Sequence, residues 1–206
     1  MPDKPNLGRS RRLLGAVPAL LLLLLFAPAA AFAAPAPGFA VSSVWEIDQP
    51  LRAGDYIWDD SRAPAGPLRI VVDLEAELLY VYRGGMEIGR SSILYGYDDK
   101  PTPTGVFPIL DKDRDHVSNI YDAPMPYMLR LTNGGIAIHG SLVEDGYATH
   151  GCVGVPEPFA AALFASAHVG DPVLITKGWT RQVYAGAEAI SPARPAAARR
   201  LAQDSP

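Results

Sequence analysis

The sequence predicts a mainly β domain, a β-sandwich or open barrel that carries one main helix. Three observations favour this fold class: short apolar runs alternate with a period of two, glycine-rich turns separate them, and a single stretch has a helical pattern. Many short strands with one helix are typical of packed sheets or a partly open barrel. With 206 residues and no internal repeat, the chain is expected to form one sizeable domain with tails.

Seven stretches have the composition or alternation of strands. They are Leu68 to Leu74, Leu78 to Tyr82, Met86 to Tyr95, Val106 to Leu110, Met128 to Thr132, Ile136 to His139 and Val173 to Thr176. The one helix is predicted over Phe159 to His168, with Pro156 and Pro158 in its first turn and Gly170 closing it. The polar stretch from Asp111 to Pro126 is expected to be a long ordered loop, which is typical of lids and binding walls.

The segments on either side of this folded region, residues 68–177, differ from it in composition. Residues 34–67 are interpreted as a proline-rich linker followed by an ordered extension with three aromatic residues at 45, 56 and 58. Residues 178–206 are rich in Ala, Pro and Arg and are expected to be a loosely ordered tail.

The first 33 residues are interpreted as a signal peptide. Basic residues at 9, 11 and 12 precede an apolar run from Leu13 to Phe32, and small residues at 31 and 33 offer a cleavage site before Ala34. An uncleaved anchor is the alternative, because a membrane-spanning helix needs about 20 apolar residues. The sequence therefore predicts export to the periplasm, with membrane attachment only if the segment is retained.

Net charge and cysteine content bear on the possible partners and on disulfide bonding. The formal net charge is −4, and it becomes −7 without residues 1–33, which disfavours nucleic acid as a partner because phosphate binding relies on clustered Lys and Arg. The single cysteine, Cys152, cannot form an internal disulfide. In an oxidising compartment a lone thiol is expected to be either buried or used.

The surroundings of Cys152 favour use. In Thr149-His150-Gly151-Cys152, an extended backbone would place the imidazole and the thiol on the same side. Gly151 leaves room for a ligand, and its N–H together with that of Cys152 could form an oxyanion hole. His139, beside the small Ala137, supplies a base for a thiol that is mostly protonated at neutral pH.

Three alternatives stay open at this point. His139, His150 and Cys152 could instead bind zinc with a water as the fourth ligand, although their spacing matches no common zinc pattern. Cys152 could be an inert core residue, which its polar and glycine-rich neighbours disfavour. His116 and His168 are interpreted as structural residues, the latter near a helix C-terminus.

His139-Gly140 followed by Thr149-His150-Gly151-Cys152 resembles the signature of the L,D-transpeptidase catalytic domain, also called the YkuD domain. The resemblance extends from about Val44 to Thr176 and includes the Thr102-Pro103-Thr104-Gly105 turn and Met125-Pro126-Tyr127. It implies a cofactor-free enzyme acting on peptidoglycan stem tetrapeptides. Terminal D-Ala would leave, and an acyl-thioester would pass to an amine of another stem peptide or of a protein.

The resemblance also implies roles for individual residues. Cys152 would be the nucleophile and His139 the general base, with His150 in support. Gly151 and Cys152 would hold the oxyanion, and the Gly140 carbonyl would orient the imidazole. Thr149 belongs to the same signature, and the residues expected at the cleft wall are Tyr121, Met125 and Tyr127.

Two departures from the family pattern keep other functions open. The spacer between His139 and Thr149 has nine residues, fewer than is commonest, and Gly154 stands where relatives carry Arg or Asn. Loss of that side chain would change substrate recognition or mark a weakened enzyme. The competing hypotheses are a hydrolase with the same site, acting as an L,D-carboxypeptidase or amidase, and a peptidoglycan-binding domain that lost activity.

Overall fold

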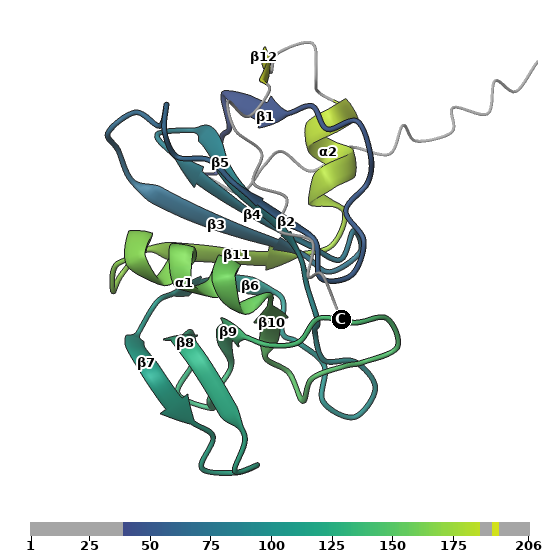
Figure 1. Cartoon of the computed structure of the whole chain (residues 1–206), viewed down its shortest axis with the longest axis vertical. Helices are drawn as coiled ribbons and strands as arrows, with labels where there is room; N and C mark the ends of the chain where they lie inside the picture. The colour runs from purple at the N-terminus through teal and green to yellow at the C-terminus, as the bar shows by residue number, and fades with distance from the viewer. Residues whose placement is uncertain (1–38, 186–190, 194–206) are drawn as a thin grey trace, which may run out of the picture. The chain divides into compact units, whose positions relative to one another are not determined.

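The computed structural model describes residues 39–185 and 191–193, which form two β-sheets and two helices (Figure 1). The predicted signal peptide, residues 1–33, the start of the predicted linker, residues 34–38, and residues 186–190 and 194–206 of the predicted tail lie outside this part. The predicted fold class, a mainly β domain with one main helix, is confirmed. Among the described residues, no helix is long and apolar enough to cross a membrane.

The larger sheet has eight strands in the order β12-β1-β5-β4-β3-β11-β6, and β2 also pairs with β5. These strands are β1 (Ser43–Trp45), β2 (Tyr56–Trp58), β3 (Leu68–Asp73), β4 (Leu78–Arg83), β5 (Met86–Ser92), β6 (Gly105–Pro108), β11 (Pro172–Thr176) and β12 (Ser191–Ala193). β3, β4 and β5 form an antiparallel meander, and β11 lies parallel to β3. The predicted strands in these regions are confirmed, with shifts of one to three residues at their ends.

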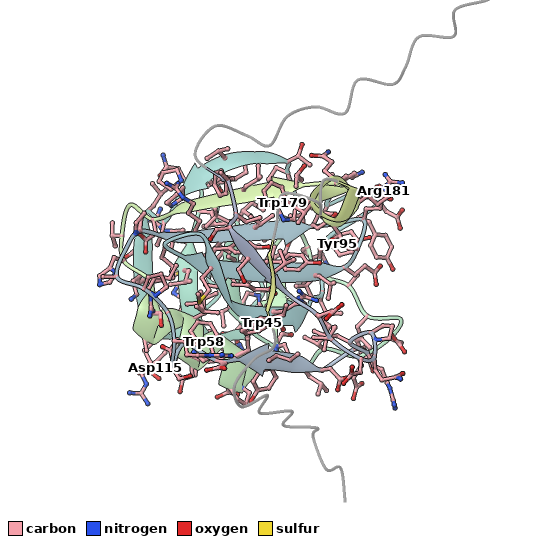
Figure 2. The ribbon with its side chains drawn as sticks, turned by 90° about the horizontal axis from the view of Figure 1, so that it is seen from above. Trp45, Trp58, Tyr95, Asp115, Trp179 and Arg181 are labelled. Carbon is pink, nitrogen blue, oxygen red and sulfur yellow. The ribbon has the colours of Figure 1, made fainter. Side chains whose placement is uncertain are left out.

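Both faces of this sheet are covered. On one face Ile70, Val72 and Val81 pack against α1 (Glu157–Ser166) and the second sheet. On the other face Val71 and Tyr80 pack against α2 (Trp179–Ala185), whose Trp179 points to the sheet while Arg181 lies at the edge of the molecule (Figure 2). The two sets alternate along β3 and β4, as the two sides of a pleated strand require.

Residues before β3 are tied to this sheet by a buried charged pair on β5. Glu87 and Arg90 form an ion pair with a 2.7 Å Nε–Oε1 distance. The Trp45 N–H donates to the second carboxylate oxygen of Glu87 at 2.6 Å, and Arg90 donates to the Trp45 carbonyl at 3.0 Å. Burial raises the pKa of Glu87, and the bonds from Arg90 and Trp45 oppose that rise. The pair thus fixes β1 beside β5.

The smaller sheet has the order β10-β9-β8-β7 and carries Met125, Tyr127, His139 and Gly140 of the predicted site. Its strands are β7 (Asp111–Val117), β8 (Pro124–Arg130), β9 (Ala137–Gly140) and β10 (Val153–Val155). β7, β8 and β9 are antiparallel, and β10 lies parallel to β9. The expectation of a long loop over residues 111–126 is therefore wrong, because most of that stretch forms a β-hairpin.

The hairpin escaped sequence analysis because charged side chains cover its inner face. Lys112 Nζ lies 4.3 Å from the centre of the Phe164 ring and donates to the Phe164 carbonyl of α1. The Arg114 guanidinium lies 5.6 Å from the centre of the Tyr127 ring. Long cationic side chains can cover apolar surface with their stems while the charge stays near water. β7 does alternate with a period of two, but the alternating residues are Lys112, Arg114 and His116 instead of apolar residues.

The segment after Gly178 also differs from expectation. It was expected to be loosely ordered, yet its first residues form α2, which is fixed by the fully buried carboxylate of Asp73. That carboxylate accepts hydrogen bonds from the N–H of Gly178 and from the N–H and hydroxyl of Thr180, all at 2.8 Å. Residues 179–185 are therefore part of the folded domain.

Candidate active site

A cleft of about 830 Å³ opens between the β7–β8 hairpin, β9 and the loop that precedes β10. Six of the nine site residues expected from the sequence line it: Tyr121, Met125, His139, Thr149, His150 and Cys152. Gly140 and Gly151 take part through their backbones. Tyr127 is not among the lining residues: it packs edge-on against Phe164 at a ring-centre distance of 5.9 Å, beneath Arg114.

The thiol of Cys152 is half-buried at the floor of the cleft. It donates a hydrogen bond to the Gly135 carbonyl, with a 3.6 Å S···O distance. Burial raises the pKa of the Cys152 thiol, and the backbone N–H of Ala137, which faces the sulfur, lowers it by a smaller amount. In the resting protein the sulfur is therefore held as a thiol.

His139 lies on β9, and its ring orientation is set by its own backbone neighbour. Its Nδ1 lies 2.8 Å from the carbonyl oxygen of Gly140, which can only accept, so Nδ1 carries the proton and Nε2 keeps its lone pair. Burial lowers the pKa of His139; the bond to Gly140 raises it, and the electrostatic influence of His116 lowers it by a smaller amount. His139 is therefore a neutral imidazole with one free basic nitrogen.

The sheet register brings the base and the nucleophile to one face. Val153 pairs with Ile138, and Gly154 pairs with His139 in the parallel ladder of β9 and β10. Cys152 precedes this ladder by one residue, so its side chain leaves on the same side as that of His139. The arrangement supplies a thiol and a singly protonated imidazole at the same cleft, as thiol-based nucleophilic catalysis requires.

The loop that carries Cys152 is held in place by Thr102, which belongs to the proline-rich turn predicted from the sequence. The buried hydroxyl of Thr102 donates to the Gly151 carbonyl at 2.9 Å and accepts the N–H of Gly96 at 2.9 Å. Isolated bridges join Leu94 to Gly154 and Gly96 to Thr149. A Cβ on Gly96 would lie 2.3 Å from the Gly151 nitrogen, so only glycine allows this approach.

The expectation of an extended segment from His150 to Cys152 is wrong. Gly151 has φ +109°, a value that favours glycine, and its N–H donates to Thr149 Oγ1 at 3.2 Å. Thr149 in turn donates to the Cys152 carbonyl at 2.6 Å. The ring of His150 stacks on Tyr121, with ring centres 4.5 Å apart and planes at 18°.

The space beside Gly154 is already occupied. A Cβ at this position would lie 3.0 Å from Ser141 Cβ and 3.4 Å from Leu94 Cβ. Ser141 lines the cleft next to His139, and its hydroxyl makes one long hydrogen bond, 3.4 Å to the Leu142 carbonyl. The side chain that is missing at Gly154 is thus replaced in space by the hydroxymethyl group of Ser141.

His116 was interpreted as structural, yet it also lines the cleft. It lies on β7, and its Nδ1 is 3.2 Å from Asp113 Oδ2. The signal that would have found it is the alternation of Lys112, Arg114 and His116 along one side of β7. His168 does lie outside the lining, near the end of α1, as interpreted.

The zinc alternative required His139, His150 and Cys152 to converge on one point. Over residues 39–185 and 191–193, no group of three His, Cys, Asp or Glu side chains is placed to share a metal ion. The ring of His150 is instead stacked on Tyr121.

The same region of the chain matches the family model of the L,D-transpeptidase catalytic domain over residues 67–175. L,D-transpeptidase 1 of Mycobacterium tuberculosis is 28% identical over 120 residues, which cover 50% of this chain and 48% of that protein. The chain thus spans about half the length of the curated relatives it matches.

Two solved structures share the fold at low sequence identity. An L,D-transpeptidase from Stackebrandtia nassauensis has a TM-score of 0.50 and 23% identity, covering 55% of this chain and 57% of its own. An L,D-transpeptidase from Mycobacterium smegmatis has a TM-score of 0.50 and 24% identity, covering 52% and 58%. Because the family model matches more than half of the chain, this protein belongs to the L,D-transpeptidase catalytic domain family.

Proposed function

We propose that this protein is a periplasmic L,D-transpeptidase that uses Cys152 to transfer the acyl group of a peptidoglycan stem tetrapeptide to an amine. The observation that carries the proposal is the pairing of one thiol with one singly protonated imidazole at the same cleft. Export rests on the signal pattern of residues 1–33. The substrate class rests on the family, whose relatives are named for this activity.

In the first half-reaction, His139 Nε2 takes the thiol proton as the sulfur attacks the carbonyl before the terminal D-Ala. The proton then passes to the departing D-Ala amine, and a thioester remains on Cys152. Because burial raises the pKa of Cys152 and lowers that of His139, proton transfer accompanies attack rather than preceding it.

The oxyanion that forms on the substrate needs a backbone donor. The Gly151 N–H donates to Thr149 in the resting structure, so the Cys152 N–H takes the larger part of this role. In the second half-reaction an amine attacks the thioester and the thiol is regenerated. Water in place of the amine would make the same site an L,D-carboxypeptidase.

The test is mass spectrometry of the purified protein after incubation with a carbapenem, and then with a disaccharide tetrapeptide. We expect an adduct on Cys152 and loss of D-Ala from the tetrapeptide, with a cross-linked product. The matched variant is Cys152→Ala, which should stay folded by circular dichroism and form no adduct.

Each other outcome has a definite meaning. A free tripeptide without a cross-linked product would show hydrolysis in place of transfer. A folded wild-type protein with no adduct from either compound would contradict the proposal and favour a binding domain that has lost its activity. Adduct formation by Cys152→Ala would exclude this nucleophile.

A further inference from the structure

His116 is a titratable side chain at the cleft that the first half-reaction does not use. It projects from β7, and it lines the same cleft as His139 and Cys152. Asp113 holds its Nδ1 at 3.2 Å, which orients the ring and leaves Nε2 as the second nitrogen. The side chain is 29% exposed, so it can exchange protons with water.

The two imidazoles project into the same cleft from two strands of one sheet. β8 lies between β7 and β9, so the strands that carry them are two spacings apart, roughly 10 Å. No hydrogen bond joins His116 to His139 in the described part of the chain, although the two side chains interact electrostatically. His116 and Cys152 line the same cleft of about 830 Å³, which has room for a substrate group.

Transfer to an amine requires the removal of one more proton than hydrolysis does. An aliphatic amine arrives at neutral pH as an ammonium ion, because its pKa is about 10. It must lose one proton before it attacks and a second as the amide forms. His139 can take one of these and pass it to the departing thiolate. The other proton must leave through a second base.

Resting on the proposed function, we infer that His116, oriented by Asp113, is the general base that deprotonates the incoming ammonium in the second half-reaction. His116 Nε2 accepts the first proton and later releases it to solvent. The free amine attacks the thioester carbonyl, the C–S bond breaks, and His139 carries the second proton to the sulfur. The sum is thioester plus ammonium giving amide, thiol and one proton.

Other charged and titratable groups line the same cleft as His116. Arg130 on β8 and Lys100 in the turn after β5 are among them, but guanidinium and ammonium groups are hydrogen-bond donors without an acceptor site. Asp99, beside Lys100, is an acceptor, but a carboxylate is a much weaker base than an imidazole. His139 serves the thiol of Cys152, and the ring of His150 is stacked face to face on Tyr121. His116 is therefore the base available to the acceptor.

The experiment separates the two half-reactions in the full mature protein. Acylation is timed with a carbapenem, and transfer is timed from the tetrapeptide acyl-enzyme to a second tetrapeptide amine or to hydroxylamine, which is already unprotonated at neutral pH. The variant is His116→Gln, which keeps a hydrogen bond to Asp113 but cannot take a proton. The matched control is His168→Gln, whose Nδ1 lies 3.8 Å from Asp171 and whose side chain is 83% exposed outside the cleft.

In His116→Gln we expect transfer to the tetrapeptide amine to fall about 100-fold at pH 7, the lower end of what general base catalysis contributes. Transfer to hydroxylamine and acylation should fall less than threefold. The deficit should shrink as the pH rises towards the pKa of the amine. His168→Gln should match wild type throughout.

Equal losses with both acceptors, or a deficit that does not change with pH, would overturn the role of His116 and leave it as a structural contact. An acceptor-specific deficit in Asp99→Asn instead of His116→Gln would assign the base to Asp99. A wild-type protein that is never acylated would contradict the proposed function itself, which is a different result from normal acylation with unimpaired transfer.

Discussion

The two walls of the cleft are built in different ways. The wall that carries Cys152 is held by three short hydrogen bonds: Thr102 bonds Gly96 and Gly151, both at 2.9 Å, and Thr149 donates to the Cys152 carbonyl at 2.6 Å. The facing wall is the tip of the β7–β8 hairpin, whose Ile120 and Tyr121 side chains are 77% and 48% exposed. Its hydrogen bonds are those of the turn itself, between residues 118 and 123.

The difference between the two walls indicates which side chains must be positioned accurately. A nucleophile and its base must be placed within a fraction of an ångström, because small displacements raise the barrier steeply. A wall that contacts the rest of the substrate can adapt, because its contribution is spread over apolar and stacking contacts. We therefore expect substitutions in the first wall to change acylation rates, and substitutions in the second to change apparent affinity.

The largest effect should come from removing the base that serves Cys152. In His139→Ala the thiol has no partner to take its proton, so acylation by a carbapenem should fall at least about 100-fold. The measurement is the rate of adduct formation by mass spectrometry, with His168→Ala as a control of similar composition. A fall of less than tenfold would exclude His139 as the base.

The pH profile checks the same residue without a change in structure. His139 acts only when neutral, and burial lowers its pKa, so the rate of wild-type acylation should persist into acid and fall to half below about pH 6.5.

A second pH profile reports on the thiol. The rate of alkylation by iodoacetamide should rise with a midpoint above the ordinary thiol pKa of about 8.5, because burial raises the pKa of Cys152.

Removing the hydrogen bonds that Thr102 makes to Gly96 and Gly151 should have the next largest effect. Thr102→Val keeps the shape of the side chain but leaves the Gly96 N–H and the Gly151 carbonyl without their partner. We expect a loss of about 1–3 kcal/mol in urea unfolding. Acylation should slow roughly 10- to 100-fold as the loop shifts. The exposed Thr104→Val is the matched control and should change neither quantity.

Restoring a long side chain at Gly154 tests whether its absence is a defect. Because Ser141 and Leu94 occupy the space, Gly154→Arg should cost about 1–3 kcal/mol of stability and should not raise activity. The double variant Gly154→Arg with Ser141→Gly should recover most of that stability. Faster acylation by the single variant would mean that Gly154 weakens the enzyme and that Ser141 does not substitute for the missing group.

The smallest effect is expected on the exposed wall. Tyr121→Ala removes an aromatic ring from the lining of the cleft, and its contact with the substrate should contribute about 0.5–1.5 kcal/mol, so KM for the tetrapeptide should rise roughly two- to tenfold while kcat changes little. Tyr147→Ala, another exposed tyrosine that does not line the cleft, serves as the control. A fall in kcat equal to that of Thr102→Val would contradict the contrast between the walls.

Much of the fold follows from local pattern. The period of two in residues 68–82 and the proline-flanked helix are visible without tertiary information, because apolar alternation and proline placement are local properties. The β7 strand and α2 are not visible in this way. One replaces apolar residues with Lys and Arg stems over aromatic rings, and the other depends on Asp73, which is more than 100 residues away.

For the candidate active site, the sequence by itself determined which residue types are available for the proposed reaction: one thiol, and an imidazole two residues after the small Ala137. It determined them because chemical reactivity belongs to residue types. Only the tertiary structure decided that Thr149 and Thr102 shape the loop, that His150 turns to Tyr121, and that His116 reaches the cleft from β7. Those outcomes depend on contacts between segments that are distant in the sequence. The free energy of such packing leaves no pattern in the local sequence from which it could be predicted.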